Sequence, residues 1–187
     1  MHEIETNRLI LRQFKDDDLE AYHLDIFNDP QVMRYLISTS SHPTRDSTRR
    51  QIARIRRDWQ TNKFGLWAVI YKEHRKFIGH CGLTIIPDTD KIEVQYVFSS
   101  NYWGKGVATE AALATLRYGF EFLKIVEIAA VSFPENVLAR RVLKKLGMHS
   151  RGEGWYYGTN LAYYTLHHSQ FTPTEDDGYI LRDVPSN

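Results

Sequence analysis

Two glycines, Gly104 and Gly106, separate the β-like run KIEVQYVFS from an alanine-rich helical pattern that begins at Val107. A strand that ends in such a turn and leads directly into a helix leaves several backbone N–H groups without intrahelical partners. These groups lie beside the positive end of the helix dipole, which favours a phosphate group. The spacing alone fits a plain structural turn equally well, because glycines most often mark turns.

Two common phosphate-binding motifs do not match this turn. A dinucleotide-binding fingerprint needs a third glycine where Thr109 stands, and an acidic residue at the end of a second parallel strand. Glu127 begins a strand instead. A P-loop ends in Gly-Lys-Ser/Thr, and GKGVAT does not offer that arrangement. The turn therefore predicts a pyrophosphate held mainly by the backbone, with Lys105 nearby as a positive charge.

The patterns on either side of the turn predict an α+β fold. A first strand is expected within NRLILRQF, followed by helices within residues 16–27 and 40–59. Three strands with short connections then predict an antiparallel meander, within residues 64–72, 76–86 and 91–99. The sequence after the glycine turn predicts a helix to about residue 121 and then a strand within residues 124–133. A helix with Pro134 in its first turn and two strands, at 148–157 and 161–168, are expected to follow. We expect the ligand where strand 91–99 leads into its helix.

Length and composition fit one domain with a sizeable core. The chain has 187 residues, 42% of them hydrophobic, and a net charge of +1, which gives no global attraction to nucleic acid or to an anionic membrane. No apolar signal segment or membrane-spanning run is found. The single cysteine, Cys81, excludes an internal disulfide and fits a reducing cytosol. We therefore expect a cytoplasmic domain over residues 1–171, as a monomer or homodimer, and a polar, mobile tail over residues 172–187.

Several separated motifs resemble the GNAT family of N-acetyltransferases. YWGKGVATEA is similar to the family's acetyl-CoA pyrophosphate loop, whose pattern Q/R-x-x-G-x-G/A runs here from Asn101 to Gly106 and departs from it at Asn101. NRLILR, KFIGHCGL, IEVQYVF and PENVLARRVLKKLGM follow in the family's order across residues 5–168. Together they most resemble the branch that acetylates ribosomal-protein N-termini. The resemblance implies a mixed, mostly antiparallel central sheet flanked by helices, with acetyl-CoA as co-substrate.

The same resemblance assigns cofactor-binding residues. It implies that Val97 and Phe98 present backbone groups to the pantetheine arm of CoA. It also implies that Asn136 contacts CoA from the following helix, although an asparagine there can simply cap its own helix. The cofactor residues implied around the turn are Trp103, Gly104, Lys105, Gly106, Val107, Ala108 and Thr109.

Acetyl transfer to an amine needs a base, because amines are mostly protonated at neutral pH. Glu93 precedes the cofactor segment and matches the family's frequent catalytic glutamate; an exposed strand residue or a structural ion pair is the alternative. The family's usual acid positions hold Leu143 and Ala139, which carry no proton donor. Tyr164 is therefore the candidate acid, with packing of its ring and protonation of the thiolate by water as the alternatives.

The expected function is acetyl transfer from acetyl-CoA to a primary amine, with a protein N-terminal α-amino group as the first candidate acceptor. A small-molecule amine acetyltransferase and a CoA-binding regulatory module without turnover stay open, and a dinucleotide-dependent oxidoreductase is a remote alternative. No metal, nucleic-acid or membrane partner is predicted; His167 and His168 lack suitably spaced ligand partners. The arginines of residues 45–57 fit a solvated helix face or the steering of an acidic partner.

Overall fold

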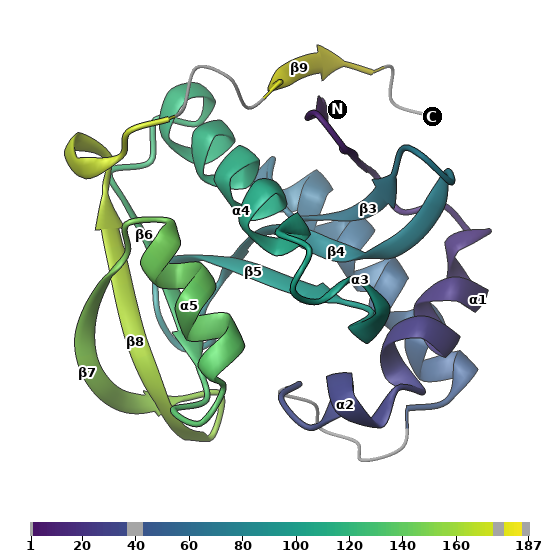
Figure 1. Cartoon of the computed structure of the whole chain (residues 1–187), viewed down its shortest axis with the longest axis horizontal. Coiled ribbons are helices and arrows are strands. Elements are labelled where there is room, and N and C mark those ends of the chain that lie inside the picture. The colour runs from purple at the N-terminus through teal and green to yellow at the C-terminus, as the bar shows by residue number, and fades with distance from the viewer. Residues whose placement is uncertain (1, 37–42, 174–177, 185–187) are drawn as a thin grey trace.

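The structure is a computed structural model that describes residues 2–36, 43–173 and 178–184. The strands in these ranges form a nine-stranded sheet in the order β7-β8-β6-β5-β4-β3-β2-β1-β9 (Figure 1). They are β1 (His2–Glu5), β2 (Leu9–Arg12), β3 (Leu66–Tyr71), β4 (Lys76–Ile85), β5 (Ile92–Phe98), β6 (Glu127–Ser132), β7 (His149–Tyr156), β8 (Thr159–His167) and β9 (Ile180–Asp183).

Neighbouring strands run antiparallel, apart from one parallel pair in the middle of the sheet. β3, β4 and β5 form the expected antiparallel meander. β5 and β6 run parallel and are paired at Glu93 and Ala129. Between them the chain passes through the glycine turn and helix α4 (Val107–Arg117). The α+β prediction and the mixed, mostly antiparallel sheet are therefore confirmed, and the turn lies at the carboxyl end of β5.

Helices cover both faces of this sheet. In Figure 1, α4 and α5 (Val137–Lys145) lie in front of the sheet, and α3 (Arg45–Asn62) lies behind it. α3 begins after Thr44, whose Oγ1 accepts a hydrogen bond from the Ser47 N–H at 3.2 Å. None of the helices in the described ranges is long and apolar enough to cross a membrane. The shorter helical segments are α1 (Asp18–Tyr22), η1 (His23–Phe27), α2 (Pro30–Met33), η2 (Ser100–Tyr102), η3 (Tyr118–Phe122) and η4 (His168–Gln170).

The pairing of β4 with β5 decides which side chains meet which helices. Cys81 pairs with Tyr96, and Cys81 Sγ lies 3.3 Å from Thr115 Oγ1 of α4, so both strand side chains point toward the α4 face. Glu93 lies three residues before Tyr96 and points to the opposite face, because side chains alternate along a strand. There it accepts a hydrogen bond from Thr84, its partner on β4.

Three short elements and the ends of two helices differ from the sequence prediction. The helix expected within residues 40–59 is α3, which runs on to Asn62, and residues 40–42 of that expectation lie outside the described ranges. β1, α2 and β9 have four residues each, too few to display a periodic pattern. β9 lies within residues 172–187 and pairs with β1, so the tail is not without regular structure; residues 174–177 and 185–187 lie outside the described ranges. Helix α5 begins at Val137 rather than at Pro134, because Asn136 takes the N-cap position.

Candidate active site

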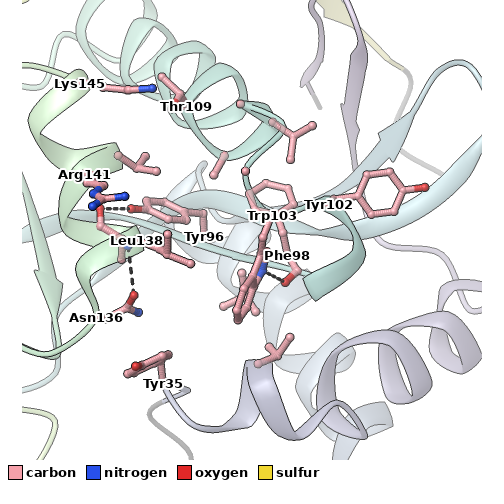
Figure 2. A pocket seen from close by; sticks show the side chains of 18 of the residues that line it. Tyr35, Tyr96, Phe98, Tyr102, Trp103, Thr109, Asn136, Leu138, Arg141 and Lys145 are labelled. Atoms are coloured by element: carbon pink, nitrogen blue, oxygen red, sulfur yellow. Dashed lines mark hydrogen bonds between the residues drawn. The ribbon is translucent and has the colours of Figure 1, made fainter.

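A cleft of about 310 Å³ opens beyond the point where β5 and β6 are paired, which is within the usual size range of ligand pockets. Its walls are the end of β5, the glycine turn, the first turns of α4, helix α5 and the segment that follows α2 (Figure 2). Lys105 is not on these walls; its Nζ lies 5.2 Å from the centre of the Tyr102 ring. The cofactor residues expected from the sequence that do line the cleft are Val97, Phe98, Trp103, Gly104, Gly106, Val107, Ala108, Thr109 and Asn136.

The glycine turn presents backbone N–H groups to this cleft. Gly104 and Gly106 have φ angles of 74° and 79°, in the left-handed region that favours glycine. The first intrahelical hydrogen bond of α4 runs from the Glu110 N–H to the Gly106 carbonyl at 3.1 Å. The N–H groups of residues 107–109 therefore precede the helical ladder and have no intrahelical acceptor. Together with the helix dipole, they form a site suited to a phosphate group.

An ion pair between Arg8, near the N-terminus, and Glu110 of α4 holds this turn in place. Arg8 Nη2 lies 2.6 Å from Glu110 Oε2, and Arg8 Nη1 donates to the Lys105 carbonyl at 2.8 Å. Thr6 Oγ1 also donates to Glu110 Oε1 at 2.6 Å. No sequence pattern reveals this role of Arg8, although Arg8 lies within NRLILR, one of the motifs that carry the family resemblance. These contacts join the segment between β1 and β2 to the N-terminal turn of α4.

Replacing Arg8 by glutamine is expected to weaken CoA binding about tenfold, because a hydrogen bond to a charged group contributes roughly 1.5–3 kcal/mol and part of this holds the turn in place. Titration calorimetry with CoA measures the effect. The matched control is Arg182→Gln, which breaks an exposed ion pair with Glu5 at the far edge of the sheet. Equal loss of affinity in both variants, or no loss in either, would show that the ion pair between Arg8 and Glu110 does not support the site.

The backbone of β5 meets the cleft at alternate residues. The Ser99 N–H donates to the Ile78 carbonyl on β4. The Val97 carbonyl also faces β4, because a Cβ atom added to Gly79 of that strand would lie only 2.1 Å from it. Since alternate residues direct their backbone groups to the same side, Tyr96 and Phe98 direct theirs toward the cleft. The Phe98 carbonyl already accepts a hydrogen bond from Trp103 Nε1 at 2.8 Å. Of the expected pair Val97 and Phe98, only Phe98 can offer backbone groups to a ligand.

Asn136 lies on the cleft wall and caps its own helix at the same time. Its Oδ1 accepts a hydrogen bond from the Ala139 N–H at 3.1 Å, as the alternative interpretation of the sequence expects (Figure 2). The cap fixes the side-chain amide at the start of α5. Its amide NH₂ group is left as the part that can donate to a ligand.

Glu93 is buried on the opposite face of the sheet, with 2% of its surface exposed. Its Oε1 accepts hydrogen bonds from Thr84 Oγ1, at 3.2 Å, and from the Tyr157 hydroxyl. Burial raises the pKa of the carboxyl to about 7, and the two hydrogen bonds oppose that shift. A carboxylate with this pKa is half ionised near neutral pH, which suits a general base.

Tyr157 covers Glu93 from the turn between β7 and β8. Burial raises the pKa of its hydroxyl above the usual value, the charge of Glu93 raises it further, and Arg54 of α3 acts in the opposite direction. The phenol therefore stays protonated and donates to Glu93. No sequence pattern indicates this role of Tyr157, because its contact with Glu93 spans 64 residues.

Tyr164 lies on β8 behind α5, away from the cleft. It lines a second hollow together with Arg140, Lys144 and Met148, and it is not among the residues of the cleft wall. Its hydroxyl accepts a hydrogen bond from Arg140 Nε at 2.9 Å. A role as the acid would therefore require Tyr164 to act from outside the cleft.

Neither Cys81 nor the metal-ligating residue types form a second reactive centre among the described residues. Burial raises the pKa of the Cys81 thiol to about 12, which keeps it in the unreactive thiol form. In the described part of the chain, no group of three or more His, Cys, Asp and Glu residues is arranged to hold a metal ion.

Comparison with known proteins decides the family. Residues 8–149 match the family model described as an acetyltransferase (GNAT) domain. The chain belongs to the GNAT acetyltransferase family. It is 34% identical to the uncharacterized N-acetyltransferase YnaD of Bacillus subtilis, over 81% of this chain and 85% of YnaD.

Solved GNAT structures share the fold. A GNAT-family acetyltransferase from Bacillus anthracis is 29% identical with a TM-score of 0.75, and the match covers 89% of this chain and 99% of that one. A ribosomal-protein-S5-alanine acetyltransferase from Vibrio fischeri has a TM-score of 0.73 at 21% identity, with 91% and 99% of the two chains covered.

Membership of the GNAT family makes this chain an N-acetyltransferase that uses acetyl-CoA. The cleft fits the pyrophosphate of that co-substrate, because residues 107–109 present N–H groups without intrahelical acceptors next to two left-handed glycines.

Proposed function

We propose that this GNAT enzyme acetylates the N-terminal α-amino group of a protein or peptide. Acetyl-CoA lies along the cleft with its pyrophosphate at residues 104–109, Phe98 and Asn136 contact its pantetheine arm, and Glu93 is the general base. The observation that carries the choice of acceptor is the pKa of Glu93, which burial raises to about 7.

This pKa matches an α-amino group better than an alkylamine. An α-ammonium group has a pKa of about 8, whereas a lysine-type ammonium has a pKa of about 10.4. The pKa of Glu93 is about 7, so an α-ammonium group gives its proton to Glu93 against a difference of about one pKa unit. A lysine-type ammonium group would do so against a difference of more than three pKa units. Glu93 is therefore an effective base for α-amino groups in particular.

The residues of the site divide the reaction between two faces of the sheet. Glu93, on the α3 side, removes a proton from the α-ammonium group, directly or through a water molecule. Tyr157 and Thr84 hold the carboxylate in place by hydrogen bonds. The N–H groups of residues 107–109 hold the donor's pyrophosphate on the α4 side. Acetyl-CoA supplies the activated acetyl group that the freed nitrogen attacks.

The charge beside Tyr157 also favours a peptide over a polyamine. Arg50, Arg54 and Arg57 are exposed and lie on one face of α3, since they are spaced by four and three residues. Arg54 acts electrostatically on Tyr157, so this face lies next to the base. Arg54 Nε also lies 3.9 Å from Asp58 Oδ2, so this face carries three positive charges and one negative charge. The net positive charge repels polyamines and attracts peptides with acidic residues. By its name, the Vibrio fischeri structure acts on an alanine of a ribosomal protein, an acceptor of the proposed kind.

A small aromatic or apolar amine is the second candidate acceptor. The β7–β8 hairpin carries Trp155, which is 75% exposed, and Tyr156, whose ring stacks on Tyr163 with a centroid distance of 5.1 Å. Such a surface beside Tyr157 can bind an apolar molecule as well as a peptide side chain.

The test compares three sets of acceptors, with CoA thiol release and mass spectrometry as readouts. The first set is peptides with free α-amino groups, with and without acidic residues at positions two to four. The second is the same peptides with acetylated N-termini and one internal lysine, and the third is polyamines and aromatic amines. We expect turnover in the first set, fastest with acidic peptides. Turnover confined to the third set would establish the small-molecule alternative, and acetyl-CoA binding without turnover in any set would favour a regulatory module.

A further inference from the structure

Tyr96 places a phenol hydroxyl inside the cleft, between β5 and α5. Its hydroxyl donates to the Ala139 carbonyl at 3.1 Å, and its ring stacks on that of Phe98 with a centroid distance of 6.5 Å (Figure 2). The Ala139 carbonyl belongs to the helical ladder of α5 and keeps an intrahelical partner if the hydroxyl turns away. The hydroxyl can therefore turn to a bound ligand at little cost.

The neighbouring tyrosines are less well placed to act in the cleft. Figure 2 shows the Tyr102 side chain pointing away from Tyr96. Tyr164 lies in the separate hollow behind α5, where Arg140 donates to its hydroxyl. Ala139 and Leu143, on the facing helix, have no side-chain proton donor at all. Tyr35, on the segment that follows α2, also lines the cleft, but the Tyr96 hydroxyl is the one held against the Ala139 carbonyl of α5. A thiolate that forms beside Ala139 thus has the Tyr96 hydroxyl as a phenol donor on the cleft wall.

We infer that the Tyr96 hydroxyl donates a hydrogen bond to the CoA sulfur as the thioester C–S bond breaks. The electron pair of that bond moves to sulfur while the carbonyl double bond re-forms, and the nitrogen gives its remaining extra proton to water. The thiolate leaves as an anion stabilised by Tyr96 and then takes a proton from water. This inference rests on the proposed acetyl transfer and adds the group that stabilises its leaving group.

Burial raises the pKa of the Tyr96 hydroxyl above its ordinary value. The phenol is therefore protonated throughout the physiological range, and it is a weaker acid than a CoA thiol, whose pKa is about 8.5. Full transfer of the proton to the thiolate is unfavourable, whereas a hydrogen bond to it is favourable and charge-assisted. Tyr96 thus acts as a donor that keeps its own proton.

The strand geometry also fits this role. Tyr96 and Glu93 point to opposite faces of β5 and are separated by three residues, or about 10 Å along the strand. The amine then approaches from the Glu93 face while the sulfur leaves toward the Tyr96 face. The acetyl carbon lies between them, as direct attack in a ternary complex requires.

The first test needs no acceptor. The thiol pKa of bound CoA is measured from the ultraviolet absorbance of its thiolate across a pH series, in the wild type and in Tyr96→Phe. A hydrogen bond to the thiolate lowers that pKa, so we expect it to be higher by about one to two units in the variant, with CoA affinity at neutral pH little changed. Equal thiol pKa values in the two proteins would overturn the inference.

The rival Tyr164 is tested in the same way with Tyr164→Phe, which removes one hydroxyl and keeps the ring. We expect that variant to leave the thiol pKa unchanged. A shift in Tyr164→Phe and none in Tyr96→Phe would assign the role to Tyr164 instead. If Tyr96→Phe does not fold, 3-fluorotyrosine at position 96, which keeps the hydroxyl and strengthens it as a donor, must lower the thiol pKa below the wild-type value.

Turnover gives an independent readout. With acetyl-CoA, Tyr96→Phe is expected to be about 10–100-fold slower than the wild type, and this defect should shrink with a donor analogue whose thiol is acidified by fluorine atoms near the sulfur. An equal defect with both donors would assign Tyr96 to positioning only. A wild type that binds CoA but acetylates no amine contradicts the proposed function, and the thiol pKa comparison then still decides the contact between Tyr96 and sulfur.

Discussion

Glu93→Gln is expected to lower turnover by about 10²–10⁴-fold, the usual contribution of a general base, and to leave CoA binding unchanged. Glutamine keeps the shape of the side chain and can still accept the hydrogen bonds from Tyr157 and Thr84, but it cannot take a proton. Steady-state rates with an acceptor peptide and calorimetry with CoA measure the two effects separately. Glu127→Gln, at the exposed start of β6, is the matched control and should keep wild-type rates.

The pH dependence of the rate tests the same assignment. In the wild type, kcat/KM should rise as the pH passes through about 7, because Glu93 acts only when ionised and its pKa is about 7. The Gln variant should lack this rise, apart from the ionisation of the acceptor itself. A variant with wild-type rates at every pH would show that Glu93 is not the base.

Stability supplies a readout for Glu93 that is independent of catalysis. The pKa of Glu93 is about 7 in the folded protein, whereas the ordinary value, which applies to the unfolded chain, is 4.5. Folding therefore disfavours the ionised form of this carboxyl. The penalty is absent below pH 4.5, grows as the pH rises, and is complete above about 7. Its size is roughly 3 kcal/mol. Urea unfolding should therefore show Glu93→Gln to be the more stable protein at pH 8 and to have no such advantage near pH 4.

The sequence predicts the larger elements of this fold because their patterns are long. The β3–β5 meander, the alanine-rich α4 and the strand–turn–helix junction all follow from alternation, helical spacing and two glycines. β1, α2 and β9 are too short for any period to appear. The parallel pairing of β5 with β6 also has no local signal, since it depends on where the chain places β6 after α4.

The site shows the same division between local and long-range information. The cradle at residues 104–109 is local, and a sequence motif captures it. Tyr157 reaches Glu93 across 64 residues, and Arg8 reaches Glu110 across 102, so no spacing rule can reveal either contact. Tyr164 became a candidate because its hydroxyl fits the chemistry, and only the packing of β8 behind α5 reveals that it lies off the cleft wall.

Gly106→Val is expected to abolish the stabilisation of this protein by CoA. Gly106 has a φ of 79°, and the nearest atom to a Cβ placed there is Arg8 Nη2 at 3.4 Å, so the cause is backbone conformation rather than crowding. A β-branched residue cannot hold this left-handed conformation without strain. The turn must then change shape, which redirects the N–H groups of residues 107–109 that the pyrophosphate needs.

Thermal unfolding with and without ligand measures the effect. At a CoA concentration of about 100 Kd, binding stabilises the wild type by about 2.7 kcal/mol, which for a chain of this length raises Tm by about 5–10 °C. NAD should give a smaller shift.

Gly147→Val is the matched control, because Gly147 has a φ of 78°, no atom within 4 Å of an added Cβ, and no place on the cleft wall. Both variants carry the same backbone strain, so both should have a lower Tm than the wild type without ligand. CoA should then raise the Tm of Gly147→Val as it does that of the wild type, and should leave the Tm of Gly106→Val unchanged. If Gly106→Val also folds and recovers fully, the pyrophosphate does not depend on this turn, and the loop assignment is wrong.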